Sequence, residues 1–371
     1  METRGMVNRM SALDILKGLM IVMMVFGHVE YIGSARHTLD VVTEVMHTFR
    51  MPLFLTLCGY LFSPHRPASE QFRKTIRRIF VPYALFMSVW IFLLLLANSK
   101  GITTQDKIDP GVLPYLNAIL FRPIATSWFL HTLIWFQLAV IFSVLLAQKL
   151  KTNGWIAILI VVMLVLHEFR QVSLISLQFL MIGVLLKHFK AQMPAAMLLG
   201  AGCIAAVVLT TGIPLYVNER QPQQLVHAVW VIGILAVING FFSTYPRAYT
   251  ASLWRYLGQN TLIILLTHMY FISIMKRLSG KFEAVDSSGL LYVTVATAVC
   301  VGGPLIIAQV MDRIGVSPLI FDRKRLYVGW SEAQKKVTGP ESNAARDVQP
   351  AVEPTAGTTV AGSINPSRQA S

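Results

Sequence analysis

The chain has 371 residues, of which 54% are hydrophobic and only 13% are charged, whereas a typical soluble domain carries roughly 25% charged residues. Together with a mean hydropathy of +0.58, this composition excludes an ordinary soluble enzyme. The net charge of +14 does not indicate a nucleic-acid partner either, because the Lys and Arg residues fall between apolar runs and form no single basic face.

The apolar residues are gathered into runs of about 20, the length that an α-helix needs to cross a bilayer. We therefore predict an all-α, polytopic integral membrane protein with about ten transmembrane helices. The three cysteines lie inside these runs without disulfide or metal-site spacing, so no metal is expected. The expected spans are 12–32, 41–62, 79–98, 127–147, 154–167, 172–187, 195–213, 225–243, 254–275 and 289–311.

Basic residues predict the orientation, because cytoplasmic loops are enriched in Lys and Arg. The loop after the second expected span, 63–78, is strongly basic, and so is the segment that follows the last span. We expect both of them in the cytoplasm, together with both chain termini. An even number of spans gives the same result.

The composition changes near the C-terminus. The membrane domain is expected at 1–312, followed by an interfacial cytoplasmic segment at 313–330 that Tyr327 and Trp330 anchor. From 331 to 371, Pro is mixed with Ala, Thr, Gly and Ser and no apolar period remains. This composition is typical of a disordered tail, here a cytoplasmic one.

The first expected span carries Asp14, Lys17 and His28 inside an otherwise apolar run. Lys17 and His28 are eleven residues apart, which on one helix is about three turns plus roughly 20°, with a rise of about 16 Å. They would therefore share one stripe of the helix. Ionisable residues inside a membrane are costly and indicate a polar pathway or site. The alternative is that Asp14 and Lys17 lie at one membrane interface and His28 at the other.

The second expected span has Glu44, His47 and Arg50 at steps of three, which predicts a common helix face. Pro52 follows and interrupts the helical hydrogen-bond ladder. Gly59 would let another helix pack closely. A simple surface pair of Glu44 and Arg50 is the alternative.

These two spans resemble the acyltransferase-3 family of membrane enzymes, which O-acetylate bacterial polysaccharides and related glycans. The resemblance extends over about 10–312, through motifs whose order and spacing match. They are LDILKG…MVFGH, FRMPLFLTLCGYLF, Arg77-Arg78-Ile79 with Val81-Pro82-Tyr83, Trp128-Phe129-Leu130, Phe179 with Gly183, and Leu257-Gly258-Gln259-Asn260-Thr261 with Leu266-Thr267-His268.

The family hallmark, a basic residue followed by ten residues and a histidine, falls on Lys17 and His28. The resemblance implies that both are catalytic, with His28 as the general base for a sugar hydroxyl, since histidine titrates nearest neutrality. It also implies acetyl-CoA as the acyl donor, with no permanently bound cofactor. The residues expected to bind the donor are Arg50, Arg73, Lys74, Arg77 and Arg78. Lys17 replaces the more common arginine, Arg50 stands where many members have histidine, and Cys58 where they have serine.

The basic residues of the 63–78 loop suit phosphate groups, but an ordinary orientation signal explains them equally well. Further residues are expected to support the catalytic pair or to meet the acceptor. For His268 a buried, satisfied imidazole is the simpler interpretation, and His131 could line the acceptor entrance. These supporting residues are Asp14, Glu44, His47, Trp128, His131 and His268.

The predicted protein is thus an O-acetyltransferase of the bacterial inner membrane. Its partners would be the lipid bilayer, acetyl-CoA, and a glycan or lipid-linked oligosaccharide from exopolysaccharide biosynthesis, as in enzymes that decorate xanthan-like polymers. Two other classes remain open: a secondary transporter with a charged intramembrane pathway, and a membrane sensor without chemistry. Neither of them should consume the acetyl-CoA thioester.

Overall fold

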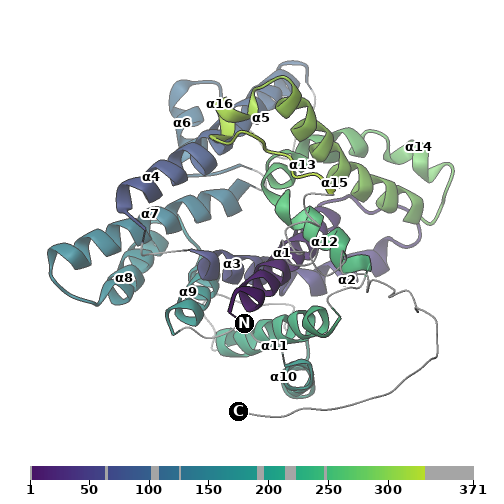
Figure 1. Ribbon diagram of the computed structural model, residues 1–371. Helices are drawn as coiled ribbons and strands as arrows, with labels where there is room; N and C mark the ends of the chain where they lie inside the picture. The colour runs from purple at the N-terminus through teal and green to yellow at the C-terminus, as the bar shows by residue number, and fades with distance from the viewer. Residues whose placement is uncertain are drawn as a thin grey trace, which may run out of the picture. The chain divides into compact units, whose positions relative to one another are not determined.

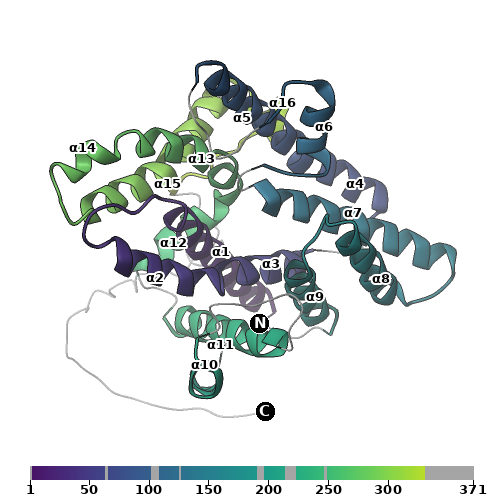
Figure 2. The same ribbon diagram turned by 180° about the vertical axis from the view of Figure 1, so that it is seen from behind.

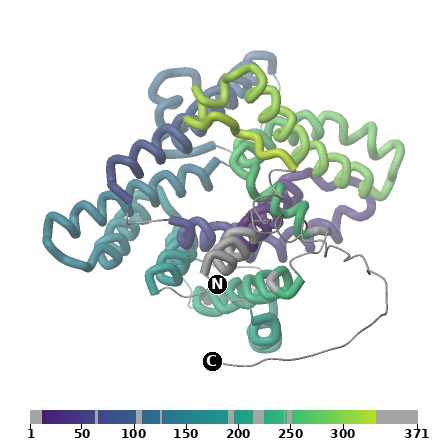
Figure 3. Tube along the Cα trace, viewed as in Figure 1, coloured from purple at the N-terminus to yellow at the C-terminus, as the bar shows by residue number. Residues whose placement is uncertain are grey.

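The computed structural model describes residues 2–62, 66–101, 108–124, 127–189, 196–213, 223–245 and 249–330, and the remainder is grey in Figure 3. Every regular element in these ranges is helical, which confirms the all-α prediction. The elements are α1 Glu2–Phe26, α2 Arg36–His47, α3 Arg50–Leu61, α4 Ala68–Thr75, the π-helical η1 Ile76–Phe80, α5 Val81–Ser99, α6 Val112–Leu120, α7 Trp128–Lys149, α8 Trp155–Glu168, α9 Leu174–His188, α10 Met197–Thr211, α11 Gln223–Thr244, α12 Tyr249–Gln259, α13 Thr261–Lys276, α14 Ser279–Glu283, α15 Leu290–Arg313 and α16 Ser317–Phe321.

The chain is a multi-pass membrane protein. Within the described ranges, four helical stretches are long and apolar enough to cross a bilayer: Ala68–Ser99, Trp128–Lys149, Gln224–Phe242 and Leu290–Arg313. The bent pair α12 and α13 would make a fifth. Apolar helices α8, α9 and α10 have 14 or 15 residues and reach only about 21–23 Å, short of a core of about 30 Å. The count of ten spans and the orientation of the termini stay predictions.

Helix α1 is the central element of the bundle. It contacts α3, α11, α12, α13 and α15, which come from widely separated parts of the chain. In both views of the molecule, Figure 1 and Figure 2, α1 lies in the middle of these helices. Its side chains Leu16, Met20 and Ile21 are at most 1% exposed. Asp14 and Lys17 are therefore half-buried on a helix that the rest of the fold encloses.

Two glycine pairs let helices cross with their backbones in contact. A Cβ added to Gly18 of α1 would lie 1.8 Å from the carbonyl oxygen of Trp254, and one added to Gly258 of α12 would lie 1.7 Å from that of Asp14. The same relation holds between α3 and α9, where a Cβ on Gly59 or on Gly183 would lie 2.1 Å from a carbonyl oxygen of the other helix. The close packing predicted at Gly59 is confirmed.

The prediction of one continuous span at 41–62 is wrong. Helix α2 ends at His47 and α3 begins at Arg50. The Thr48 hydroxyl donates to the carbonyl of Val45 (2.7 Å), and Pro52 lies in the first turn of α3. The N–H groups in the first turn of a helix have no acceptor within the helix, so proline, which has no N–H group, fits there. Glu44, His47 and Arg50 consequently do not share one helix face.

The expected ninth span is also divided. Helices α12 and α13 meet at Asn260 with a bend of 84°. The Asn260 side chain fixes the bend, because its amide donates to the carbonyls of Tyr256 (2.9 Å) and Val328 (3.0 Å) while its oxygen accepts from the N–H of Val328 (2.9 Å). The segment after the last long helix thus holds the break in place.

The first helix ends earlier than the expected span 12–32, since α1 ends at Phe26. His28 lies in the turn that follows, where its N–H donates to the carbonyl of Val25 (3.0 Å). The chain beyond it is tied to the turn before α15, because the N–H of Ser34 donates to Ser287 (3.0 Å) and that of Ala35 to Ser288 (3.1 Å). Two glycines with positive φ, Gly33 (φ 70°) and Gly289 (φ 78°), make this contact possible.

The segment 314–330 follows α15 and includes α16, and we call it the C-terminal strap. The Asp312 carboxylate accepts hydrogen bonds from the backbone N–H groups of Leu326 and Tyr327, both at 2.9 Å. The hydroxyls of Tyr327 and Tyr256 lie 2.9 Å apart, and the ring of Trp330 packs on Tyr256 at 5.4 Å. The predicted disordered tail, 331–371, lies outside the described residues.

Candidate active site

His28 is placed beside a second histidine. Its ring lies 5.7 Å from that of His268 on α13, and the two planes are 28° apart, a stacked arrangement. His28 is half-buried, whereas His268 is fully buried. The turn after α1 thus brings the predicted base against the helix that follows the break at Asn260.

Hydrogen bonds fix the tautomer of His268. Its Nδ1 lies 3.0 Å from the carbonyl oxygen of Ile264 and 2.9 Å from that of Leu265. A carbonyl only accepts, so Nδ1 carries the proton and Nε2 is the unprotonated nitrogen. Nε2 is buried and has no hydrogen-bond partner among the described residues. The simpler interpretation of His268, a satisfied imidazole, therefore holds for one ring nitrogen and not for the other.

Arg50 is the most deeply buried cation beside His28, with 2% of its surface exposed. Its Nη1 donates to the carbonyl of Met23 (3.0 Å), and its Nη2 lies 2.8 Å from Nε2 of His47. The guanidinium occupies the space next to Gly27, where an added Cβ would lie 1.6 Å from Nη1. The Nε–H group is buried without a partner in the described structure, so this cation keeps one donor available.

Four predicted residues are therefore gathered in one place by α1, α2, α3 and α13: His28, His47, Arg50 and His268. Arg50 and His47 lie within electrostatic range of His28. A histidine beside a buried cation with an unused donor is a pairing that could serve acyl transfer, in which a base accepts the proton of the hydroxyl and a donor stabilises the oxygen that becomes negative.

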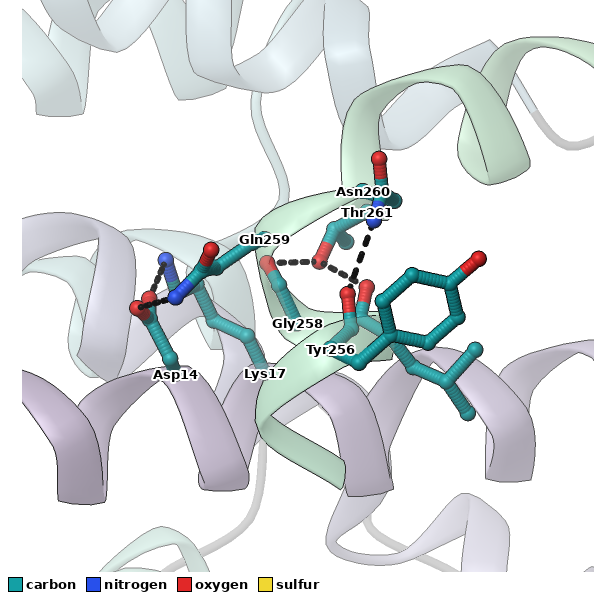
Figure 4. A network of polar contacts seen from close by, with 8 residues as sticks. Asp14, Lys17, Tyr256, Gly258, Gln259, Asn260 and Thr261 are labelled. Atoms are coloured by element: carbon teal, nitrogen blue, oxygen red, sulfur yellow. Dashed lines mark hydrogen bonds and ion pairs between the residues drawn. The ribbon is translucent and has the colours of Figure 1, made fainter. Parts of the chain in front are cut away.

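Lys17 belongs to a separate cluster. Its ammonium lies 2.5 Å from Oδ1 of Asp14, and the Gln259 amide donates to Oδ2 of the same carboxylate (3.2 Å). Figure 4 shows the three side chains converging where α1 crosses α12. Lys17 and Phe26, the last residue of α1, are separated by a helical rise of about 14 Å, and His28 lies in the turn beyond Phe26. The predicted catalytic pair is thus divided between two clusters.

The predicted donor-binding residues Arg73, Lys74, Arg77 and Arg78 occupy α4 and η1. Lys74 pairs with Glu70, one turn earlier. Arg77 and Arg78 both face Asp322, at 4.0 Å and 3.5 Å. The π-helical geometry of η1 is typical of functional positions in helices, and here it carries the two arginines that meet the C-terminal strap.

Trp128 and His131 lie on α7, which packs on α4 and α8. His131 is buried, with Nε2 at 2.9 Å from both the carbonyl oxygen of Leu120 and the indole nitrogen of Trp135. Trp128 is 38% exposed. Glu44 is exposed and forms no ion pair with the described residues. The structure does not gather these three around His28.

An apolar pocket lies between α5 and α13, with about 420 Å³ of space not filled by atoms, its open mouth included. Its two tyrosine hydroxyls are engaged, since Tyr270 donates to the carbonyl of Phe86 (2.5 Å) and Tyr83 to that of Ile119 (3.0 Å), whereas the indole N–H of Trp90 has no hydrogen-bond partner among the described residues. The pocket therefore presents mainly ring faces and thioethers, which suit an apolar ligand.

Sequence reasoning missed Gln259 and Asp322 as members of these clusters. Gln259 is uncharged, so no cost of burial singles it out, and its motif was noted only as a family resemblance. Asp322 lies far along the chain from Arg77 and Arg78. Only the folded chain brings it to them.

A family model described as an acyltransferase domain matches residues 10–309 of the chain. This range includes both clusters on α1 and reaches into α15. The protein is a membrane acyltransferase, and the chain belongs to the acyltransferase-3 family. No curated protein and no solved structure matches it significantly.

Proposed function

We propose that the protein is an O-acetyltransferase of the bacterial inner membrane. It moves an acetyl group from cytoplasmic acetyl-CoA to a sugar hydroxyl of an exopolysaccharide or another surface glycan. The observation that carries this proposal is the cluster of His28, Arg50 and His268, because it joins a base to a buried cation inside a fold of the acyltransferase family.

In the proposed reaction, His28 accepts the proton of the sugar hydroxyl as its oxygen attacks the thioester carbonyl. The carbonyl oxygen becomes negative, and the unused Nε–H of Arg50 donates to it. When the C–S bond breaks, the sugar keeps the acetyl group and the thiolate of coenzyme A takes the proton from His28. The base is then neutral again, and no proton is gained or lost overall.

Lys17 acts at a distance from this step. The Asp14 carboxylate pairs with its ammonium and accepts a hydrogen bond from the Gln259 amide of α12, whereas His28 lies in the turn beyond the far end of α1. We assign Lys17 to positioning the extended donor. The cations of η1 would bind the phosphates at the cytoplasmic end. The phosphates and the thioester of one donor are far apart, so a divided site suits the molecule.

Substitution of His28 is the direct test. His28→Gln keeps the size and some hydrogen bonding but cannot take up a proton at neutral pH. We expect glycan acetylation to fall by about 10²–10⁴-fold, the usual contribution of a general base. The measurement is acetyl transfer by purified, well-folded protein, with mass spectrometry of the cell-surface glycan as a second readout.

Substitution of Lys17 provides the comparison. Lys17→Ala should also be severe, whereas Lys17→Arg should retain activity because it keeps the cation. Wild-type acetylation by His28→Gln would show that His28 is structural and would contradict the mechanism. Failure of the wild-type protein to consume acetyl-CoA at all would favour a transporter or a sensor.

A further inference from the structure

Two arginines of η1 meet a carboxylate that the C-terminal strap supplies. Asp322 follows α16 directly and adopts a left-handed conformation (φ 50°), which aspartate tolerates better than most residues. Its N–H donates to the carbonyl of Pro318 (3.2 Å). The carboxylate thus reaches Arg77 and Arg78 from a backbone position that the end of α16 fixes.

The contact is an incomplete ion pair. Arg77 Nη1 lies 4.0 Å from one carboxylate oxygen and Arg78 Nε lies 3.5 Å from the other. A charge-assisted N–H···O bond is normally about 2.7–2.9 Å long. The Arg78 Nε–H is buried and has no hydrogen-bond partner among the described residues. Its donor is therefore shielded from water and still unsatisfied.

Positive charge exceeds negative charge at this place. Arg323, next in the chain to Asp322, lies close enough to Arg78 for their charges to repel. Arg77 and Arg78 thus share one carboxylate, while Arg323 and its exposed neighbour Lys324 add positive charge to the same segment of the chain. A dianion with three acceptor oxygens, such as a phosphate group, would match these donors better than the carboxylate does.

We propose that Arg77, Arg78 and Arg323 form a phosphate site in which the Asp322 carboxylate holds the place of the phosphate, so that the donor must displace it to bind. This inference rests on the proposed function, since it takes the phosphate to be that of the acyl donor. Asp322 would then act as an internal competitor that keeps the arginines together when no donor is bound.

The competition predicts a gain of affinity when the carboxylate is neutralised. Asp322→Asn keeps the size of the side chain and tolerates the left-handed backbone equally well. Removing one negative charge a few ångströms from a bound phosphate is expected to tighten binding by about threefold to tenfold at low salt. The gain should shrink in 1 M salt, where the screening length is only about 3 Å.

The test measures dissociation constants of the full-length protein in lipid nanodiscs for two probes, coenzyme A and pantetheine, which lacks the phosphates. Asp322→Asn should bind coenzyme A more tightly and pantetheine as before. Asp40→Asn is the matched control, because it makes the same charge change and breaks another exposed arginine–aspartate pair, Arg36–Asp40 at 3.7 Å. It should leave both constants unchanged.

Unchanged binding of coenzyme A by Asp322→Asn would contradict the competition. Weaker binding would contradict it too, and would mean that the carboxylate orients the arginines.

The double variant Arg77→Gln with Arg78→Gln tests the donor site separately from the competition by Asp322. If the double variant binds coenzyme A more weakly while Asp322→Asn binds it no more tightly than wild type, the donor site is supported and the competition is refuted. If it binds coenzyme A normally, the donor site itself is refuted.

Discussion

The two stacked histidines differ in what their surroundings allow. His268 has its proton held on Nδ1 by two backbone carbonyls, which leaves Nε2 as a fixed acceptor beside His28. The ring nitrogens of His28 have no hydrogen bond among the described contacts, so neither is held by a backbone carbonyl. A fixed acceptor next to the proposed base suits a positioning residue.

Replacing His268 should therefore affect the reaction without abolishing it. His268→Phe keeps a stacked ring but removes the acceptor nitrogen. We expect the turnover number to fall by about tenfold, less than the loss of a general base, with little change in the Michaelis constant for acetyl-CoA. Steady-state kinetics over a range of pH would measure both quantities.

Equal kinetics of His268→Phe and wild type would reduce the role of His268 to packing. Restoration of activity by His268→Asn, whose side chain offers a polar group of smaller size, would support the role of the acceptor.

At this scale the sequence predicted much of the cluster, because buried cations and histidines in an apolar run are conspicuous. His28, His47, Arg50 and His268 were all marked and do meet. The single helix face predicted for Glu44, His47 and Arg50 was not correct, because the backbone breaks between His47 and Arg50. Neutral Gln259 gave no comparable signal, although it holds Asp14.

At the scale of helices, the crossing of α1 with α12 positions the Lys17 cluster. Gly18 and Gly258 remove the side chains that would separate the two backbones. The Gln259 amide reaches Asp14 because it follows Gly258 directly. The crossing thus determines both packing and the distance between the amide and the carboxylate.

Gly258→Ala tests this crossing. The new Cβ would lie 1.7 Å from the carbonyl oxygen of Asp14, so the helices must separate. We expect a loss of stability of about 1–3 kcal/mol, as for other overpacked sites, together with reduced acetylation. Thermal unfolding in detergent would measure the first effect. Gly202→Ala is the control, because a Cβ there meets nothing within 4 Å and alanine favours a helix. A Gly258→Ala protein as stable as the control would contradict the proposed close contact.

Helix positions followed well from the apolar runs, while the breaks within them did not. The runs 41–62 and 254–275 are uniformly apolar enough to look continuous. Tertiary contacts divide them, and at Asn260 these contacts include the distant Val328. A hydropathy pattern does not contain such a partner, so it cannot predict the bend.

For the whole molecule, we predict that the 63–78 loop and both chain termini lie in the cytoplasm. This prediction rests on the basic residues at 63–78 and after 312. Reporter fusions at Ala68 and at Ala351 should be active only when the reporter works in the cytoplasm. A periplasmic signal at either position would put the phosphate-binding arginines on the side without acetyl-CoA, which would contradict both the topology and the donor site.

The close contact between the turns at Gly33 and Gly289 affects how genetic variation in this protein is interpreted. A Cβ at Gly289 would lie 2.1 Å from the carbonyl oxygen of Ile32, four residues after His28. A side chain at either glycine would displace the chain that follows His28. If His28 is the proposed base, a substitution of Gly289 should reduce acetylation, although it maps near the far end of the membrane domain. Substitutions in one of the two turns are expected to be tolerated only together with compensating substitutions in the other.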